Sequence, residues 1–327
     1  MKVCYLIPII ALVITGCAVT PTTQIQAFGD STKAITDKVD SVIDEYNQSA
    51  LTRSFTDYAA TYSGSHANDL TSKLLEDIQQ PIDNKAKKGL AIYRANRAIG
   101  AYAKSLSALS VAGSRTDIDL ASAKLYGSMT AVNTQYKTIN ENDADLFHAE
   151  DFAVATRLIT AIGGLIIEEK RNDAIKGIVI SADPKIAALC DAINKQLDES
   201  GIYDGISTSR QYVLSEEIKN YKTQAQKDTT LEWRRSEIKR LYGLKQGVTN
   251  SKLLIKNAQK AIRAIKTSHA TLAGELKDNK FNSEAIAQAI GRLKDLENHY
   301  DSYETLLLEC EKIEKNDKGV LNCADKN

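Results

Sequence analysis

The feature that most constrains this chain is how rarely proline interrupts its helical pattern. The 327-residue sequence contains four prolines, of which only Pro81 and Pro184 lie inside the long periodic segments. Proline has no backbone N–H and clashes with the preceding turn, so its scarcity permits very long helices. Apolar residues recur every three or four positions over most of the chain, as they do along one face of a helix. The sequence therefore predicts an all-α protein with essentially no sheet.

The lengths of the periodic segments predict how the helices pack. Segments of roughly 25–40 residues form helices about 40–60 Å long. Each carries one apolar stripe that must face a neighbour, and an elongated antiparallel bundle satisfies this need. We expect Asp183 and Pro184 to cap and open one helix, and Gly243 with Gly247 to end another. The expected segments are 30–62, 67–111 with an interruption at Pro81, 117–139, 151–180, 184–199, 207–245, 250–276 and 284–313.

The N-terminus has the pattern of an export signal. Lys2 is followed by an apolar run over residues 3–14, shorter than the about 20 residues that span a bilayer. The run ends in Ile14-Thr15-Gly16-Cys17, an aliphatic residue and two small residues before a cysteine. This pattern resembles the lipobox of bacterial lipoproteins. The resemblance implies that residues 1–16 are a signal peptide, cut between Gly16 and Cys17, and that Cys17 carries a diacylglyceryl thioether and an N-acyl chain.

The same resemblance implies an address and a set of boundaries. In enterobacterial lipoproteins an Asp after the lipidated cysteine marks retention in the inner membrane, whereas this chain has Ala18. We therefore expect a lipid-anchored protein of the outer membrane that faces the periplasm. Residues 17–27 are expected to be the lipidated N-terminus and a tether, residues 28–316 the helical bundle, and residues 317–327 a C-terminal tail. An acidic loop at 140–150 is a possible boundary within the bundle.

Three cysteines remain in the mature chain beyond Cys17, in a compartment where disulfides form. An odd number cannot pair completely. We predict a disulfide between Cys310 and Cys323, because the short loop between them lets the tail fold back on the last helix; the alternative is that all three are free. Cys190 lies on a helical apolar face and is predicted to behave as a small buried hydrophobe.

Motifs for catalysis and metal binding are absent from the sequence. It contains no GxGxxG, GxxxxGKS/T, HExxH or GxSxG, the motifs of phosphate cradles, zinc proteases and serine hydrolases. The acidic loop, with Asp143, Asp145 and His148, could hold a cation; the competing interpretation is a solvated loop. The other histidines, including His269, are isolated in sequence and are predicted at the surface or on helix flanks. We predict no catalytic residue, cofactor or metal site; the alternative is an enzyme whose groups converge from distant helices.

The charge pattern is more informative. Between residues 234 and 266 the sequence has ten bases and a single acid. Lys252, Lys256, Lys260 and Arg263 share one helical face, which indicates contact with phospholipid head groups, lipopolysaccharide phosphates or an acidic partner. Nucleic acid is not expected. The alternative is that these bases pair with acids of an antiparallel last helix, which are Asp295, Glu297, Asp301, Glu304, Glu309, Glu311, Glu314 and Asp317.

The leading functional expectation is a non-enzymatic outer-membrane lipoprotein whose bundle is a scaffold or binding module for an envelope protein or polymer. One alternative is a membrane-active bundle, pore-forming or lipid-binding. It is motivated by the apolar stretch 158–167, with Gly163-Gly164 at its centre. In architecture alone, this stretch resembles the hidden hairpin of α-helical pore-forming toxins; burial in the bundle is the competing interpretation.

Overall fold

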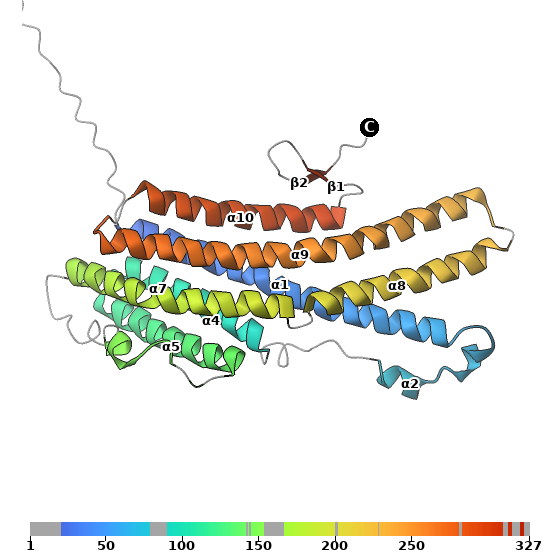
Figure 1. Cartoon of the computed structure of the whole chain (residues 1–327), viewed down its shortest axis with the longest axis horizontal. Helices are drawn as coiled ribbons and strands as arrows, with labels where there is room; N and C mark the ends of the chain where they lie inside the picture. The colour runs from blue at the N-terminus through green and yellow to red at the C-terminus, as the bar shows by residue number, and fades with distance from the viewer. Residues whose placement is uncertain are drawn as a thin grey trace, which may run out of the picture.

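The computed structural model shows an elongated bundle of long helices (Figure 1). It describes residues 21–78, 90–141, 143, 145–153, 167–199, 202–227, 229–280, 283–309, 313–315 and 321–323. The prediction of an all-α bundle is confirmed. Its elements are α1 (Pro21–Thr61), the 3-10 helix η1 (Gly64–Asp69), α2 (Ser72–Glu76), α4 (Ala91–Val111), α5 (Arg115–Asn140), α7 (Ile167–Glu199), α8 (Ile202–Ala225), α9 (Leu231–Lys277), α10 (Glu284–Glu309), β1 (Ile313–Lys315) and β2 (Leu321–Cys323).

Helix α1 is the central element of the bundle, because it contacts α4, α8, α9 and α10. It begins at Pro21, and proline is favoured at the first position of a helix. Ile25 and Phe28 are each only 1% exposed. Their burial holds these first turns in the core, so residues 21–27, predicted to be part of a tether, belong to the packed body.

Two glycines let α1 and α4 approach closely. A Cβ on Gly29 would lie 2.4 Å from the carbonyl oxygen of Ala103, and a Cβ on Gly100 would lie 2.4 Å from Thr36 Oγ1. A side chain at position 29 would require the two backbones to move apart, whereas one at position 100 would require the side chain of Thr36 to move. The close contact also allows the buried amide of Asn96 on α4 to donate to the carbonyl oxygen of Thr36 on α1.

The hydrophobic core is one cluster that draws side chains from all the long helices. Cys190 on α7 is fully buried in it, which confirms its predicted role as a small hydrophobe, and burial raises the pKa of its thiol. The acidic loop does not divide the cluster. Phe147 of this loop is 1% exposed, and its backbone N–H donates to Asn133 Oδ1 over 2.6 Å. The core therefore continues across the possible boundary at 140–150.

Helix α7 continues through Pro184, so the prediction that Asp183 and Pro184 open a helix is wrong. Ala182 and Ile186 are buried in the core on either side of the proline. Their packing stabilises a helical backbone that proline disfavours. Asp183 does not cap a helix; its carboxylate lies 3.0 Å from Nδ1 of His269.

The prediction that Gly243 and Gly247 end a helix is also wrong, because both glycines lie inside α9. The chain reverses earlier, between the end of α8 at Ala225 and the start of α9 at Leu231. Thr230 caps α9, because its Oγ1 accepts a hydrogen bond from the backbone N–H of Trp233 over 3.1 Å. Across the turn, the rings of Tyr221 and Trp233 stack with centroids 5.8 Å apart. A glycine within a helix costs only about 1 kcal/mol, and the 47-residue helix continues through both glycines.

The last helix begins where the sequence predicts. The Oγ of Ser283 accepts from the backbone N–H of Ile286 over 3.2 Å, a cap of the preferred type. Beyond α10, β1 and β2 form an antiparallel ribbon in which Ile313 lies opposite Cys323. Among the described residues, this ribbon of two three-residue strands is the exception to long helices.

Candidate functional site

The basic face predicted on α9 is open to solvent. Lys252, Lys256, Lys260 and Arg263 are all exposed, on the side of α9 away from its buried residues. Within the part of the chain that the structure describes, no ion pair involves these four side chains. The structure therefore brings the four predicted residues together on one free surface.

Other bases of α9 point toward neighbouring helices and are paired there. Arg240 Nη2 lies 2.6 Å from Glu217 of α8, and the hydrogen bond between them raises the pKa of the guanidinium. Lys266 Nζ lies 2.7 Å from Asp191 of α7. The bases of α9 thus fall into an inner, paired group and an outer group that faces water.

The competing interpretation paired the outer bases with acids of α10. The structure describes the side chains of two of those acids, Asp295 and Glu297, and neither forms an ion pair with another described residue. The four bases are exposed with α10 in its place against α9. Helix α10 therefore does not cover them.

Sequence reasoning missed the apolar side chains that share this side of α9. Leu231 and Ile238 lie at helical spacing in the predicted segment 207–245, where an apolar stripe should be buried, whereas they are 63% and 55% exposed. Tyr242 and Leu253 are 52% and 39% exposed. The four residues are separated by 7, 4 and 11 positions, intervals that return to one side of a helix. This spacing was the signal in the sequence for an apolar stripe on one helix. The predicted helix end near residue 245 concealed it, because it divided the stripe between two segments.

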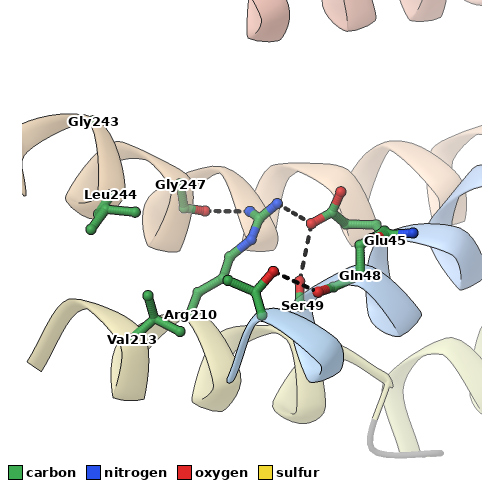
Figure 2. A pocket seen from close by; sticks show the side chains of 9 residues that line it. Glu45, Gln48, Ser49, Arg210, Val213, Gly243, Leu244 and Gly247 are labelled. Atoms are coloured by element: carbon green, nitrogen blue, oxygen red, sulfur yellow. Dashed lines mark hydrogen bonds and ion pairs between the residues drawn. The ribbon is translucent and has the colours of Figure 1, made fainter. Parts of the chain in front are cut away.

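A pocket of about 270 Å³ lies where α8 and α9 leave the bundle beside α1, and Figure 2 shows Arg210 at its centre. The Arg210 guanidinium donates to the carbonyl oxygen of Gly247 and to Ser251 Oγ, and it pairs with Glu45. Ser49 Oγ donates to the same Glu45 carboxylate over 3.0 Å. The two charged side chains of the pocket satisfy each other. The contacts of Arg210 therefore join three helices. The volume of the pocket is smaller than the roughly 300–1,000 Å³ of small-molecule sites.

A buried polar network connects α4, α7 and α9. The Tyr102 hydroxyl lies 3.1 Å from His269 Nε2, and His269 Nδ1 lies 3.0 Å from Asp183. The arrangement resembles a catalytic triad in its order of contacts, but Tyr102 and His269 are each 1% exposed. Burial also raises the pKa of the Tyr102 hydroxyl, so this group stays protonated. The predicted surface position of His269 is wrong, and its role is structural.

A second polar cluster surrounds Asp151. Lys185 Nζ and Ser181 Oγ of α7 donate to its carboxylate, and so does the backbone N–H of His148, over 2.8 Å. Burial raises the pKa of Asp151, but these hydrogen bonds outweigh burial and hold the pKa below its ordinary value. The cluster does not activate a nucleophile, because Ser181 donates to a carboxylate and Lys185 is paired. Its contacts with His148 cap the start of a helix.

In the acidic loop, the carboxylate of Asp145 contacts neighbouring side chains. Asp145 lies 2.9 Å from Lys137 Nζ and accepts from Asn133 Nδ2 over 3.1 Å. These contacts occupy the carboxylate of Asp145, so Asp145 does not act together with Asp143 and His148. Among the described residues, no three His, Cys, Asp or Glu side chains are placed to hold a metal ion.

Several predictions concern residues outside those that the structure describes. The lipobox with Gly16 and Cys17 precedes the first described residue, and the apolar stretch 158–167 falls almost wholly in the gap before α7. The side chains of Cys310 and Cys323 are also outside the described set. Lipidation, the apolar hairpin and the disulfide therefore stay predictions. Within the described helices, no segment is long and apolar enough to cross a bilayer.

Comparisons of the chain with protein-family models, with curated proteins and with solved structures found no match. Three features of the molecule bear on its function. They are the surface of α9, the hairpin that α8 and α9 form, and the lipobox pattern at the N-terminus.

Proposed function

We propose that this chain is a lipoprotein of the outer membrane, anchored through acyl chains on Cys17 and facing the periplasm. Its helical bundle acts as a non-enzymatic scaffold or binding module for an envelope protein or polymer. The proposal rests on one structural element, which we call the arm. The arm comprises residues 215–250, that is, the distal part of α8 and the proximal part of α9.

The arm is a surface element without a core of its own. No described residue between 215 and 250 is buried. Figure 1 shows the joined ends of α8 and α9 standing clear of α10 and separated from the C-terminal end of α1. The two helices hold each other through the Arg240–Glu217 ion pair and the stacked rings of Tyr221 and Trp233. A long hairpin that buries so little supports a role in contact with a partner.

The base of the arm is held firmly to α1. The Tyr212 hydroxyl donates to Asp57, and this hydrogen bond raises the pKa of Tyr212 to about 12. The guanidinium of Arg53 lies 5.1 Å from the centre of the same ring. With Arg210 bound to Glu45 nearby, these contacts fix the direction in which the arm projects.

The position of α1 supports display of the arm away from the anchor. Pro21 follows Cys17 by four positions, a span of at most about 14 Å. Phe28, near the start of α1, lies 5.8 Å from His269 on α9. From there back to Leu231, α9 extends about 57 Å at 1.5 Å per residue. Acyl chains on Cys17 would thus hold one end of the bundle at the bilayer and place the arm tens of ångströms along it.

Site-specific photocrosslinking in cells that export the lipidated protein tests the proposal. A photoreactive residue at Asn220 or Thr223, both exposed on α8, should give the same discrete adduct. The matched controls are Lys104 of α4 and Lys124 of α5, which are equally open to solvent. Controls should give no discrete adduct. If the arm positions behave like the controls, the binding-module proposal is wrong.

A further inference from the structure

One side of α9 is exposed from Leu231 to Arg263, and we call it the outer face. Its side chains recur at intervals of three and four residues, which places them within about a third of the helix circumference. The face extends about 48 Å along the axis. Its basic residues, all exposed, are Arg235, Lys245, Lys252, Lys256, Lys260 and Arg263.

The positive charge of the outer face is not compensated. Within the described structure none of its six basic side chains forms an ion pair. The two acids of the same segment are Glu232 and Glu237, and helical spacing places both away from this face. Glu237 binds Arg240, 2.9 Å away on the paired side of the helix. A partner for this face must therefore present negative charge along a comparable length.

Apolar side chains are interleaved with these bases. Leu231, Ile238 and Tyr242 are each more than half exposed, and Leu253 is 39% exposed. A polyanion in water would gain nothing from contact with them. An anionic bilayer would, because apolar side chains of an interfacial helix enter the boundary between head groups and acyl chains while Lys and Arg stay among the phosphates.

We propose that the outer face of α9 binds the surface of an anionic phospholipid bilayer, with the helix lying along the membrane plane. The opposite side of α9 packs against α7, α8 and α10, so the helix is formed before it binds. Binding therefore does not require the folding that isolated amphipathic peptides undergo at membranes. The proposal does not depend on lipidation of Cys17, because the face lies wholly within α9.

Vesicle co-sedimentation tests the proposal with a chain that begins at residue 18 and so keeps every described element. The chain should bind vesicles of phosphatidylcholine mixed with phosphatidylglycerol, and it should not bind vesicles of phosphatidylcholine alone. Binding should weaken as salt is added, because salt screens exposed charges. Equal binding to both vesicles, or no binding to either, overturns the proposal.

A basic-face variant locates the contact. Each base near an anionic surface contributes a factor of about five, so removal of four should weaken binding at least about tenfold. Glutamine retains helix propensity. The variant combines Lys252→Gln, Lys256→Gln, Lys260→Gln and Arg263→Gln.

The matched control removes four exposed lysines from other surfaces and changes net charge equally. It should bind as the unmodified chain does, and equal loss in both variants would assign binding to net charge and overturn the proposal. The control combines Lys73→Gln, Lys104→Gln, Lys124→Gln and Lys294→Gln, on α2, α4, α5 and α10.

An apolar variant separates a bilayer from other anionic partners. Ile238→Gln, Tyr242→Gln and Leu253→Gln together should also weaken vesicle binding, and this loss should persist in high salt. If only the basic variant loses binding, the face recognises charge alone, and the proposal of a helix whose apolar side chains enter the bilayer interface is overturned. If vesicles do not bind but the basic variant loses a protein adduct in cells, the partner is an acidic protein and the proposal is overturned.

The orientation of the helix can be read from tryptophan fluorescence. Trp233, the single tryptophan of the chain, stacks on Tyr221 on the side facing α8. In the double variant Trp233→Tyr with Tyr242→Trp, the tryptophan moves to the outer face. Its emission should shift to shorter wavelength with anionic vesicles, whereas the emission of Trp233 in the unmodified chain should stay constant. Equal shifts at both positions would overturn the proposal that α9 lies on the bilayer with its outer face.

Discussion

At the scale of single residues, polar side chains in this bundle take their roles from partners far along the chain. His269 looks isolated in the sequence, yet it contacts Tyr102 and Asp183 from two other helices. Arg210 similarly binds Glu45 of α1 and Ser251 of α9. Periodicity identifies which side of a helix faces inward, but it does not identify which polar groups meet there.

Glycines of one chain should respond oppositely to the same substitution. Gly243→Ala and Gly247→Ala should each stabilise α9 by about 1 kcal/mol, because alanine is the better helix former and a Cβ at either position meets no atom within 4 Å. Gly29→Ala should destabilise the protein, since its Cβ would lie 2.4 Å from the Ala103 oxygen. Chemical denaturation and hydrogen exchange in α9 measure these effects. A common sign for all three variants would contradict this account.

The Asp151 cluster should make stability depend on pH in the acid range. Because folding lowers the pKa of Asp151, its contribution is complete above the ordinary Asp pKa of about 3.9 and is lost as pH falls through the folded-state pKa. Asp151→Asn should therefore cost about 2 kcal/mol at neutral pH and progressively less below about pH 4. Urea titrations of both proteins at several pH values measure this difference. A gap that does not change with pH would contradict the assignment.

At the scale of elements, α9 is one helix with two environments. Its C-terminal part packs on α7 and α10 and contributes buried residues such as Ile265 and Leu272, whereas its part in the arm contributes none. Local stability follows the number of buried contacts. The arm should therefore open without unfolding the bundle, which suits an element that meets a partner.

Hydrogen exchange should reveal this difference and the importance of the Thr230 cap. Amides at the start of α9 should exchange faster than those near Leu272. Thr230→Ala should accelerate exchange in the first turns about fivefold, because a lost cap costs about 1 kcal/mol. Thr249→Ala, at an exposed position inside the helix, is the control and should not accelerate exchange. Equal effects of the two substitutions would show that the cap does not hold the turn.

At the scale of the whole molecule, the anchor and the fold should be separable. The first described helix starts at Pro21, and core contacts such as those of Ile25 and Phe28 lie beyond Cys17 in the sequence. The α8 side of the arm and the outer face of α9 then offer two contact surfaces. A bundle held at one end could use both along its length.

Blocking lipidation should release a folded protein. In Cys17→Ser the acyl chains are lost, and with them the membrane affinity of about 0.8 kcal/mol for each buried methylene. When membranes are washed at high salt, which screens the contacts of the outer face, the variant should leave the membrane fraction, and it should keep the circular dichroism and thermal midpoint of the lipidated protein. Mass spectrometry of the unmodified mature protein should find acylated Cys17. An intact Met1, or loss of fold in the variant, would contradict the lipoprotein assignment.

The sequence by itself determined the helical class, the bundle and several helix ends. Those features depend on local chemistry: proline scarcity, apolar spacing, and caps such as Ser283 at the start of α10. The exposed basic face of α9 was also readable, because Lys252, Lys256 and Lys260 lie at helical intervals within one segment.

Tertiary structure alone decided where helices continue and which stripes are covered. Packing of Ala182 and Ile186 holds α7 helical through Pro184, although the local preference favours a break. Leu231 and Ile238 have the spacing of buried residues, yet they are exposed, and no helix that the structure describes covers that side of the arm. Apolar periodicity predicts that a stripe exists. Contacts between distant segments decide whether a neighbouring helix covers that stripe.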